Sequence, residues 1–217
     1  MKKLLSVAIF SLAMLVCLPA VAQHGKDAHN HKGAHKEAKG RHNHKEAMTK
    51  AIINNIFTRK SVRSYTGGAV TKDTLELLVK AGMAAPTGMN RQPWQFYATN
   101  NPKIIEEAAK KLGRGGNMVK EAGAVIVVCG VPAESEIYWA IDATCATENI
   151  LLAAEALGLG AVWLSAYPNE ERMNTVSEAF GIPKEFKVLC YIPVGHPTGK
   201  EQPKDKWKPE RFHFDKW

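Results

Sequence analysis

The sequence predicts an α+β domain in which helices cover a central sheet, and two observations lead to this fold class. From Ala51 onward, segments with helical periodicity alternate with short apolar or alternating segments that are typical of strands. One of them, EAGAVIVVCGV, is apolar without interruption after its first residue, as expected of a strand buried on both faces. No internal repeat is present, so the 217 residues indicate one domain with an N-terminal appendage.

The first elements of the domain are two helices and a strand. The segment AIINNIFTRK is amphipathic, and TKDTLELLVKAGMA places its leucines on one helical face with Thr71 as the expected N-cap. The segment APTGMNRQPWQF, residues 85–96, then breaks the helical pattern at Pro86. It continues into WQFYAT, which alternates and contains aromatic residues as a strand does. A tight loop between a helix and a strand is therefore predicted here.

The remaining elements follow from capping and apolar patterns. NPKIIEEAAKKLG is predicted as a short helix that begins after its proline and stops at Gly113, and GRGGNMVKEAG as a loop. ESEIYWAIDATCATENILLAAEALGLG is long enough for about seven helical turns. Because it is apolar almost all round, it belongs in a core or a subunit interface. AVWLSA and FKVLCYIPVGH are predicted as two further strands.

Residues 1–22 have the pattern of a secretory signal peptide. Lys2 and Lys3 precede an apolar segment that ends in Ala20-Val21-Ala22, an A-x-A cleavage pattern. Cys17 invites comparison with a lipoprotein signal, but the bulky Val16 stands where a small residue is expected. We therefore expect cleavage after Ala22 and a periplasmic or secreted protein with no stable membrane anchor.

Residues 23–50 form a histidine-rich segment that contains six of the eight histidines. It has almost no large apolar residue, so a flexible tail is predicted. His29 with His31, and His42 with His44, form H-x-H pairs suited to zinc, copper or nickel. A divalent-metal tail and a solubilising linker both remain open. The domain itself is predicted as residues 51–217.

The charge distribution argues against nucleic acid as a partner. The formal charge is +8, of which two charges lie in the signal peptide and four in residues 23–50, leaving +2 for the domain. No basic stripe with interleaved aromatic residues is present. Cys129, Cys145 and Cys190 lie in apolar surroundings, so buried free thiols are expected, although a disulfide between two of them is not excluded.

The chemistry-bearing residues resemble a cofactor site rather than a hydrolase. FTRKSVRSYTGG places Arg59, Lys60, Ser61 and Arg63 within five positions, a set of donors that suits a phosphate group. No Ser-His-Asp order, H-E-x-x-H or strand-linked G-x-G-x-x-G is present. A protein that binds, orients and polarises an organic cofactor fits this combination.

Four segments together resemble the FMN-dependent nitroreductase family: TRKSVRSY, APTGMNRQPWQF, NMVKEAGAVIVVCG and ALGLGAVWLSAYP. The resemblance extends from about Ile52 to the C-terminus in family order. It implies a nitroreductase-like α+β fold with a mostly antiparallel sheet, an intertwined homodimer, and one FMN at each of two interface sites.

The resemblance also implies roles for individual residues. The FMN phosphate and ribityl chain would be held by Arg59, Lys60 and Ser61, with Lys206 and Lys204 completing the phosphate site. Arg63 and Lys120 would lie near the N1/O2 edge of the flavin, and Asn117 would bind its pyrimidine edge. The partner subunit would contribute Pro86, Thr87, Gly88 and Asn90, and the backbone at Ser165 and Ala166 would face flavin N5.

The implied activity is a two-step transfer of two electrons. A reduced donor, NAD(P)H in most relatives, would pass hydride to flavin N5, and a nitroaromatic, quinone or similar acceptor would then be reduced. Export conflicts with this donor, because nicotinamide cofactors are cytoplasmic. Two alternatives stay open: a flavin-dependent dehalogenase or flavin-degrading relative, and an exported metal-handling protein in which the histidine tail acts and the domain is a scaffold.

Overall fold

The protein is described by a computed structural model that gives the backbone of residues 31–217 and side chains from residue 43 onward. The chain divides into two compact units, Met1–Glu46 and Ala47–Trp217. The predicted signal peptide, residues 1–22, lies outside the described residues, as do the first residues of the histidine-rich segment. Among the helices described, none combines the length and apolarity needed to cross a bilayer.

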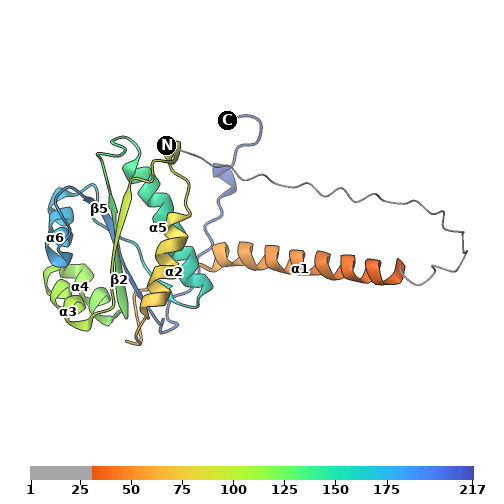
Figure 1. Cartoon of the computed structure of the whole chain (residues 1–217), viewed down its shortest axis with the longest axis horizontal. Coiled ribbons are helices and arrows are strands. Elements are labelled where there is room, and N and C mark those ends of the chain that lie inside the picture. The colour runs from red at the N-terminus through yellow and green to blue at the C-terminus, as the bar shows by residue number, and fades with distance from the viewer. Residues whose placement is uncertain (1–30) are drawn as a thin grey trace, which may run out of the picture. The chain divides into compact units, whose positions relative to one another are not determined.

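A five-stranded antiparallel sheet forms the centre of the second unit (Figure 1). Its order is β1-β2-β5-β3, and β4 also pairs with β5. Every strand pair is antiparallel, which confirms the predicted sheet. The strands are β1 (Trp94–Thr99), β2 (Ala124–Gly130), β3 (Gly160–Ala161), β4 (Leu164–Ser165) and β5 (Lys187–Gly195).

Helices cover both faces of this sheet. One face is covered by α2 and α5, and the other by α3, α4 and α6. The helices are α1 (His31–Thr58), α2 (Lys72–Met83), α3 (Pro102–Lys111), α4 (Gly116–Glu121), α5 (Trp139–Ala156) and α6 (Glu170–Phe180). Three short 3₁₀ turns are η1 (Gly88–Asn90), η2 (Gly113–Gly115) and η3 (Pro209–Arg211).

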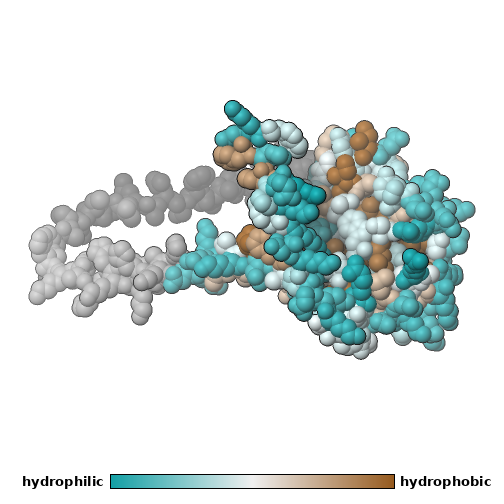
Figure 2. All heavy atoms as spheres, turned by 180° about the vertical axis from the view of Figure 1, so that it is seen from behind, coloured by the Kyte–Doolittle hydropathy of each residue, from teal (hydrophilic) through white to brown (hydrophobic). Residues whose placement is uncertain are grey.

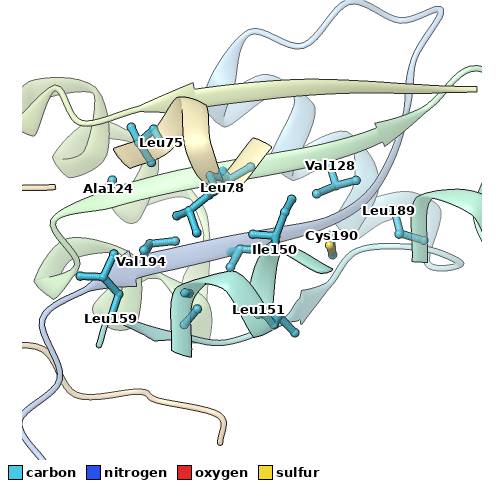
Figure 3. Packing of buried hydrophobic residues seen from close by; sticks show 14 of the residues in the cluster. Leu75, Leu78, Ala124, Val128, Ile150, Leu151, Leu159, Leu189, Cys190 and Val194 are labelled. Atoms are coloured by element: carbon cyan, nitrogen blue, oxygen red, sulfur yellow. The ribbon is translucent and has the colours of Figure 1, made fainter. Parts of the chain in front are cut away.

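The core explains why the central strands read as apolar without interruption. All seven residues of β2 are buried, because helices pack on both of its faces. Figure 3 shows Leu78 of α2 and Ile150 of α5 converging over the sheet, and both are fully buried. Gly82 lets α2 approach α5 closely, because a Cβ atom there would lie 3.0 Å from the Ile150 side chain.

The predicted local signals are largely confirmed. Thr71 caps α2 by accepting a hydrogen bond from the backbone N–H of Thr74, and Asn101 caps α3 in the same way through Lys103. The segment after α2 is a loop that leads into β1, as predicted. Cys129 and Cys190 are buried free thiols, and Cys145 is a half-buried one, so the described chain has no disulfide between them.

Three elements differ from the prediction. The long central helix, α5, has 18 residues, because Glu136 to Tyr138 form turns before it and Gly158 takes a left-handed conformation, φ +70°, after it. The predicted loop GRGGNMVKEAG contains η2 and α4. The single predicted strand AVWLSA is two short strands, β3 and β4, interrupted at Val162 and Trp163.

The histidine-rich segment also differs from the flexible tail that we predicted through Lys50. Helix α1 begins at His31 and continues without interruption to Thr58. The flexible tail was predicted from the lack of large apolar residues, which indicates only that the segment cannot form a core of its own. The segment contains no proline and is rich in lysine and alanine, which are strong helix formers, so local propensity favours a helix there.

Candidate cofactor site

The basic turn, which we define as residues 59–66, is held between β3 and the chain that follows β5. Ser61 forms a bridge with Ala161, and the backbone N–H of Val62 donates to the Ala161 carbonyl at 3.0 Å. On the other side, the backbone N–H of Thr66 donates to the His196 carbonyl at 2.9 Å. The turn therefore has a fixed backbone rather than the freedom of a solvated loop.

Tyr65 locks this turn onto the end of the sheet. Its buried hydroxyl donates to either the Val62 carbonyl at 2.8 Å or the Pro193 carbonyl at 3.1 Å. Burial raises the pKa of this phenol well above its ordinary value, and the nearby Glu201 carboxylate raises it further. Tyr65 is therefore a neutral structural residue at working pH.

The first two cations of the basic turn are paired with carboxylates of α5. Arg59 Nε lies 3.1 Å from Glu148 Oε1, and Lys60 Nζ lies 3.0 Å from Glu155 Oε1. In the described chain the Nη groups of Arg59 have no protein acceptor, so the guanidinium can still bind a second anion. Lys60 donates to both oxygens of Glu155, which leaves it less available.

Arg63 and the start of the C-terminal arm, residues 196–217, come together at Glu201. The Arg63 backbone N–H donates to Glu201 Oε1 at 2.7 Å, and the Thr198 backbone N–H donates to the Ser64 carbonyl at 3.1 Å. Desolvation raises the pKa of Glu201, but hydrogen bonds from Arg63 and Ser64 outweigh it, so the pKa lies below its ordinary value. Segments from opposite ends of the domain are thus joined here.

Further along the arm, Lys204 and Lys206 are exposed. Neither makes a hydrogen bond or ion pair with another described residue. They follow Glu201 by three and five positions. The hydrogen bond between Glu201 and the basic turn therefore fixes the start of the arm that carries both lysines. The structure thus brings the start of the arm to the basic turn but leaves the side chains of both lysines in solvent.

Asn117 and Lys120 both lie on the exposed side of α4. The opposite side of α4 is buried through Val119, and Gly116 packs so closely that a Cβ atom would lie 2.1 Å from the Ala109 carbonyl oxygen. Just after α4, a Cβ atom at Gly123 would lie 2.2 Å from the Gly68 carbonyl oxygen. The C-terminal end of α4 therefore lies beside the chain that leaves the basic turn.

The loop of Pro86, Thr87, Gly88 and Asn90 lies at the other end of the sheet. The backbone N–H of Gly88 donates to the Asp142 carboxylate at 3.1 Å, and the Val131 backbone N–H donates to the Pro93 carbonyl just after the loop. Val131 comes directly after the last residue of β2, so the loop lies at that end of the strand. Helix α4, which lies beside the basic turn, precedes the first residue of β2. Since β2 has seven residues, the two ends are about 20 Å apart. One chain cannot bring this loop to the basic turn.

Ser165 and Ala166 lie on and just after β4 and differ in accessibility. Ser165 is exposed, and its carbonyl accepts a hydrogen bond from Arg172 Nη1 at 3.4 Å. Ala166 is 1% exposed, and its backbone N–H donates to the Leu189 carbonyl at 3.0 Å. Of the two predicted flavin neighbours, Ser165 is the accessible one, and the amide of Ala166 is already bonded within the chain.

Comparison with known proteins identifies the family. The model of the nitroreductase family matches residues 56–196, which include the basic turn, α4 and β4. This chain belongs to the nitroreductase family. A protein of Archaeoglobus fulgidus described as an NADH dehydrogenase/NAD(P)H nitroreductase is 38% identical over 75% of this chain and 96% of its own length.

Solved structures show the same fold. A crystal structure from Bacteroides thetaiotaomicron, described as an NADH dehydrogenase/NAD(P)H nitroreductase, is 42% identical to this nitroreductase-family chain with a TM-score of 0.72. The match covers 77% of this chain and 98% of the other. A nitroreductase from Desulfovibrio desulfuricans, solved in complex with FMN, is 28% identical with a TM-score of 0.65 and covers 76% and 97% of the two chains. The nitroreductase fold is therefore confirmed.

Sequence reasoning missed the acidic residues of this nitroreductase site. Glu148 and Glu155, which pair with the basic turn, lie seven positions apart on α5, so they share one helix face. Two acids at that spacing on one face of a largely apolar helix were a usable signal. Nothing local marked Asp142 or Glu201 as partners of backbone amides. Over the described residues, no group of three potential metal ligands is present.

Proposed function

We propose that this protein is an FMN-dependent oxidoreductase that uses NAD(P)H to reduce a nitroaromatic, a quinone or a similar acceptor. The main support is the clamped basic turn, where Arg59, Lys60 and Arg63 lie against the start of the C-terminal arm, which the contacts of Thr198 and Glu201 hold in place. The named activities of the relatives agree: the Archaeoglobus protein is described as an NAD(P)H nitroreductase, and a Bacillus subtilis relative, 26% identical, as an FMN reductase (NADPH).

The residues present fit a phosphate-bearing cofactor. The backbone N–H of Arg63 already binds an oxyanion, the carboxylate of Glu201, which shows that this turn presents its amide to negative charge. Arg59 keeps its Nη groups available, and Arg63, Lys204 and Lys206 add positive charge. Charge-assisted hydrogen bonds of this type are the strong ones in phosphate recognition.

In this proposal the protein binds, orients and polarises. FMN would supply the chemistry, by accepting two electrons as hydride and passing them on. Arg59 and Lys206 would hold the phosphate, while Arg63 and Lys120 would place positive charge at the pyrimidine edge, which favours the anionic reduced form. We assign no side chain as general acid or base.

The proposed active form is a homodimer, because one chain separates two parts of the site. The loop of residues 86–90 and the basic turn lie at opposite ends of β2, so a second copy must supply the loop. Apolar side chains on the described part of α1 are exposed in the single chain, among them Ile52, Ile56 and Phe57 at 59%, 49% and 73%. Burial of such a surface would stabilise a dimer.

The test is a spectrum followed by steady-state kinetics. The purified protein should be yellow with a flavin spectrum and should bind added FMN after the flavin is removed. It should then oxidise NADH or NADPH in the presence of nitro compounds and quinones. A colourless protein that refuses FMN, or an FMN-loaded one that oxidises neither nucleotide with any acceptor, would refute the proposal.

We also propose that the protein is exported, from the signal pattern in residues 1–22. Cell fractionation and N-terminal sequencing test this proposal: a periplasmic or secreted protein that begins at Gln23 is expected. A cytoplasmic protein that retains Met1 would refute it. Export would also mean that NAD(P)H must be replaced or supplied outside the cytoplasm, so reduction by other donors should be assayed on the same sample.

A further inference from the structure

A cavity of about 510 Å³ opens between the α3–α4 corner, β4 and the first turn of α6. Its wall contains three cations, Lys111, Arg114 and Arg172, against one acidic residue, Glu171. The end of the molecule formed by α3, α4 and α6 is coloured mainly as hydrophilic residues in Figure 2. The lining thus has a net formal charge of +2 at neutral pH.

These cations are not neutralised by the surrounding chain. The ion pairs among the described side chains include none of the three, so no carboxylate lies within 4.0 Å of them. Lys111 donates to the Glu178 carbonyl at 3.3 Å, and Arg172 donates to the Ser165 carbonyl at 3.4 Å, so both are anchored through neutral acceptors. The positive charge of the cavity therefore remains available to a ligand.

A buried tyrosine also faces this cavity. Tyr191 of β5 is only 5% exposed and lines the cavity, and among the described residues its hydroxyl has no hydrogen-bond partner. The fold leaves space for this hydroxyl at Gly115, where a Cβ atom would lie 2.0 Å from Tyr191 Oη. Burial raises the pKa of Tyr191, although the positive charge of Arg172 opposes this shift. The hydroxyl therefore keeps its proton and can donate a hydrogen bond to an acceptor.

We infer that this cavity binds a carboxylate or phosphate group of a substrate, with Arg172 and Tyr191 as its principal ligands and Lys111 and Arg114 as supporting charges. A planar guanidinium and a neutral hydroxyl donor together match the two oxygens of such a group. Ser165 lines the same cavity, so the bound anion would lie beside the predicted flavin contact. The assignment of the anion to a substrate rests on the proposed function.

Two sources of the anion are distinguished by matched probes on the FMN-loaded protein. For an acceptor, we compare 4-nitrobenzoate with its neutral analogue 4-nitrobenzamide. For the donor, we compare NADP⁺ with NAD⁺, which differ by one phosphate. Dissociation constants come from calorimetry on the oxidised protein, where no turnover occurs, and steady-state assays with the two nitro compounds give kcat and KM.

We expect Arg172→Gln and Tyr191→Phe each to weaken binding of the nitrobenzoate anion. Its dissociation constant and its KM should both rise by about tenfold, the loss typical of a hydrogen bond to a charged group. The same two quantities for the neutral amide should change less than about twofold. Tyr191→Phe preserves the packing of β5, so it separates ligand binding from folding. Lys110→Gln, on the neighbouring position of α3 but outside the cavity, is the control and should have no effect.

The outcomes separate this inference from the proposed function. A selective loss of NADP⁺ over NAD⁺ binding, with nitrobenzoate binding unchanged, would assign the anion to the donor. Equal losses for charged and neutral probes, or no loss in either variant, would overturn the anion site. Tight nitrobenzoate binding that depends on Arg172, in a protein that reduces no acceptor, would support the site and refute the proposed activity.

Discussion

Replacing Arg59 by alanine tests the proposed phosphate site most directly. The Arg59 side chain is 16% exposed and contacts Glu148 only through Nε, which leaves its Nη groups for an oxyanion. A hydrogen bond to a charged group contributes about 1.5–3 kcal/mol. The dissociation constant of FMN should therefore rise by about 10- to 150-fold, since each 1.4 kcal/mol corresponds to about tenfold.

The ion pair with Glu148 complicates this result, and a second variant resolves it. Arg59→Ala leaves the Glu148 carboxylate without its partner, and that charge would repel a phosphate as well. Because Glu148 is 47% exposed, solvent screens much of this repulsion. Glu148→Gln alone should therefore leave FMN binding within about threefold of the wild type or tighten it.

The assay is fluorescence titration of flavin-free protein with FMN. The double variant Arg59→Ala, Glu148→Gln should bind FMN nearly as weakly as Arg59→Ala does. If Arg59→Ala retained wild-type affinity, Arg59 would not be a phosphate ligand. If the double variant recovered wild-type affinity, the loss in Arg59→Ala would come from the unpaired Glu148 charge. Arg59 would then again not be a phosphate ligand.

Three further predictions concern stability, measured by urea unfolding. Ile150→Ala removes a fully buried side chain and should lower the free energy of unfolding by about 2–5 kcal/mol. Gly116→Ala places Cβ 2.1 Å from the Ala109 carbonyl oxygen, so a loss of at least about 1–3 kcal/mol is expected, and wild-type stability would contradict this packing. Glu201→Gln should cost about 1 kcal/mol at pH 7. Because the pKa of Glu201 is lowered in the folded state, its stabilisation is present above about pH 4.3 and is lost as the pH falls through the folded pKa. The stabilities of the two proteins should then converge once the pH is below the folded pKa, and a difference that stays constant with pH would contradict the assignment.

The fold could be predicted because its signals are local. Thr71 and Asn101 cap their helices through bonds to residues two or three positions away, and β2 is marked by an apolar run of its own. Those patterns need no knowledge of the partner elements. The length of α5 was overestimated for the same reason: Ile137 and Tyr138 continue the apolar pattern, and only the turns formed by Glu136 to Tyr138 exclude them from the helix.

The site could be predicted only in part, because its partners are distant in sequence. The cations of the basic turn are visible as a cluster, but Arg59 meets Glu148 and the Arg63 amide meets Glu201 across separations that no spacing rule connects. Likewise, the motif at Ala166 predicts an amide that is free to face the flavin. The bond from that amide to Leu189 depends on how β4 approaches β5, which the sequence alone does not specify.

The loop of residues 86–90 is held in place by hydrogen bonds within its own chain. Met89, Asn90 and Gln92 all have positive φ angles, between 51° and 54°, a conformation that is unfavourable for residues other than glycine. The Asp142 carboxylate compensates by binding the Gly88 amide, and Thr87 Oγ1 accepts from the Gln92 backbone N–H at 3.2 Å. A loop held by its own chain loses little entropy on binding. In the proposed dimer it would therefore act as a preformed wall of the neighbouring site rather than one that folds around a ligand.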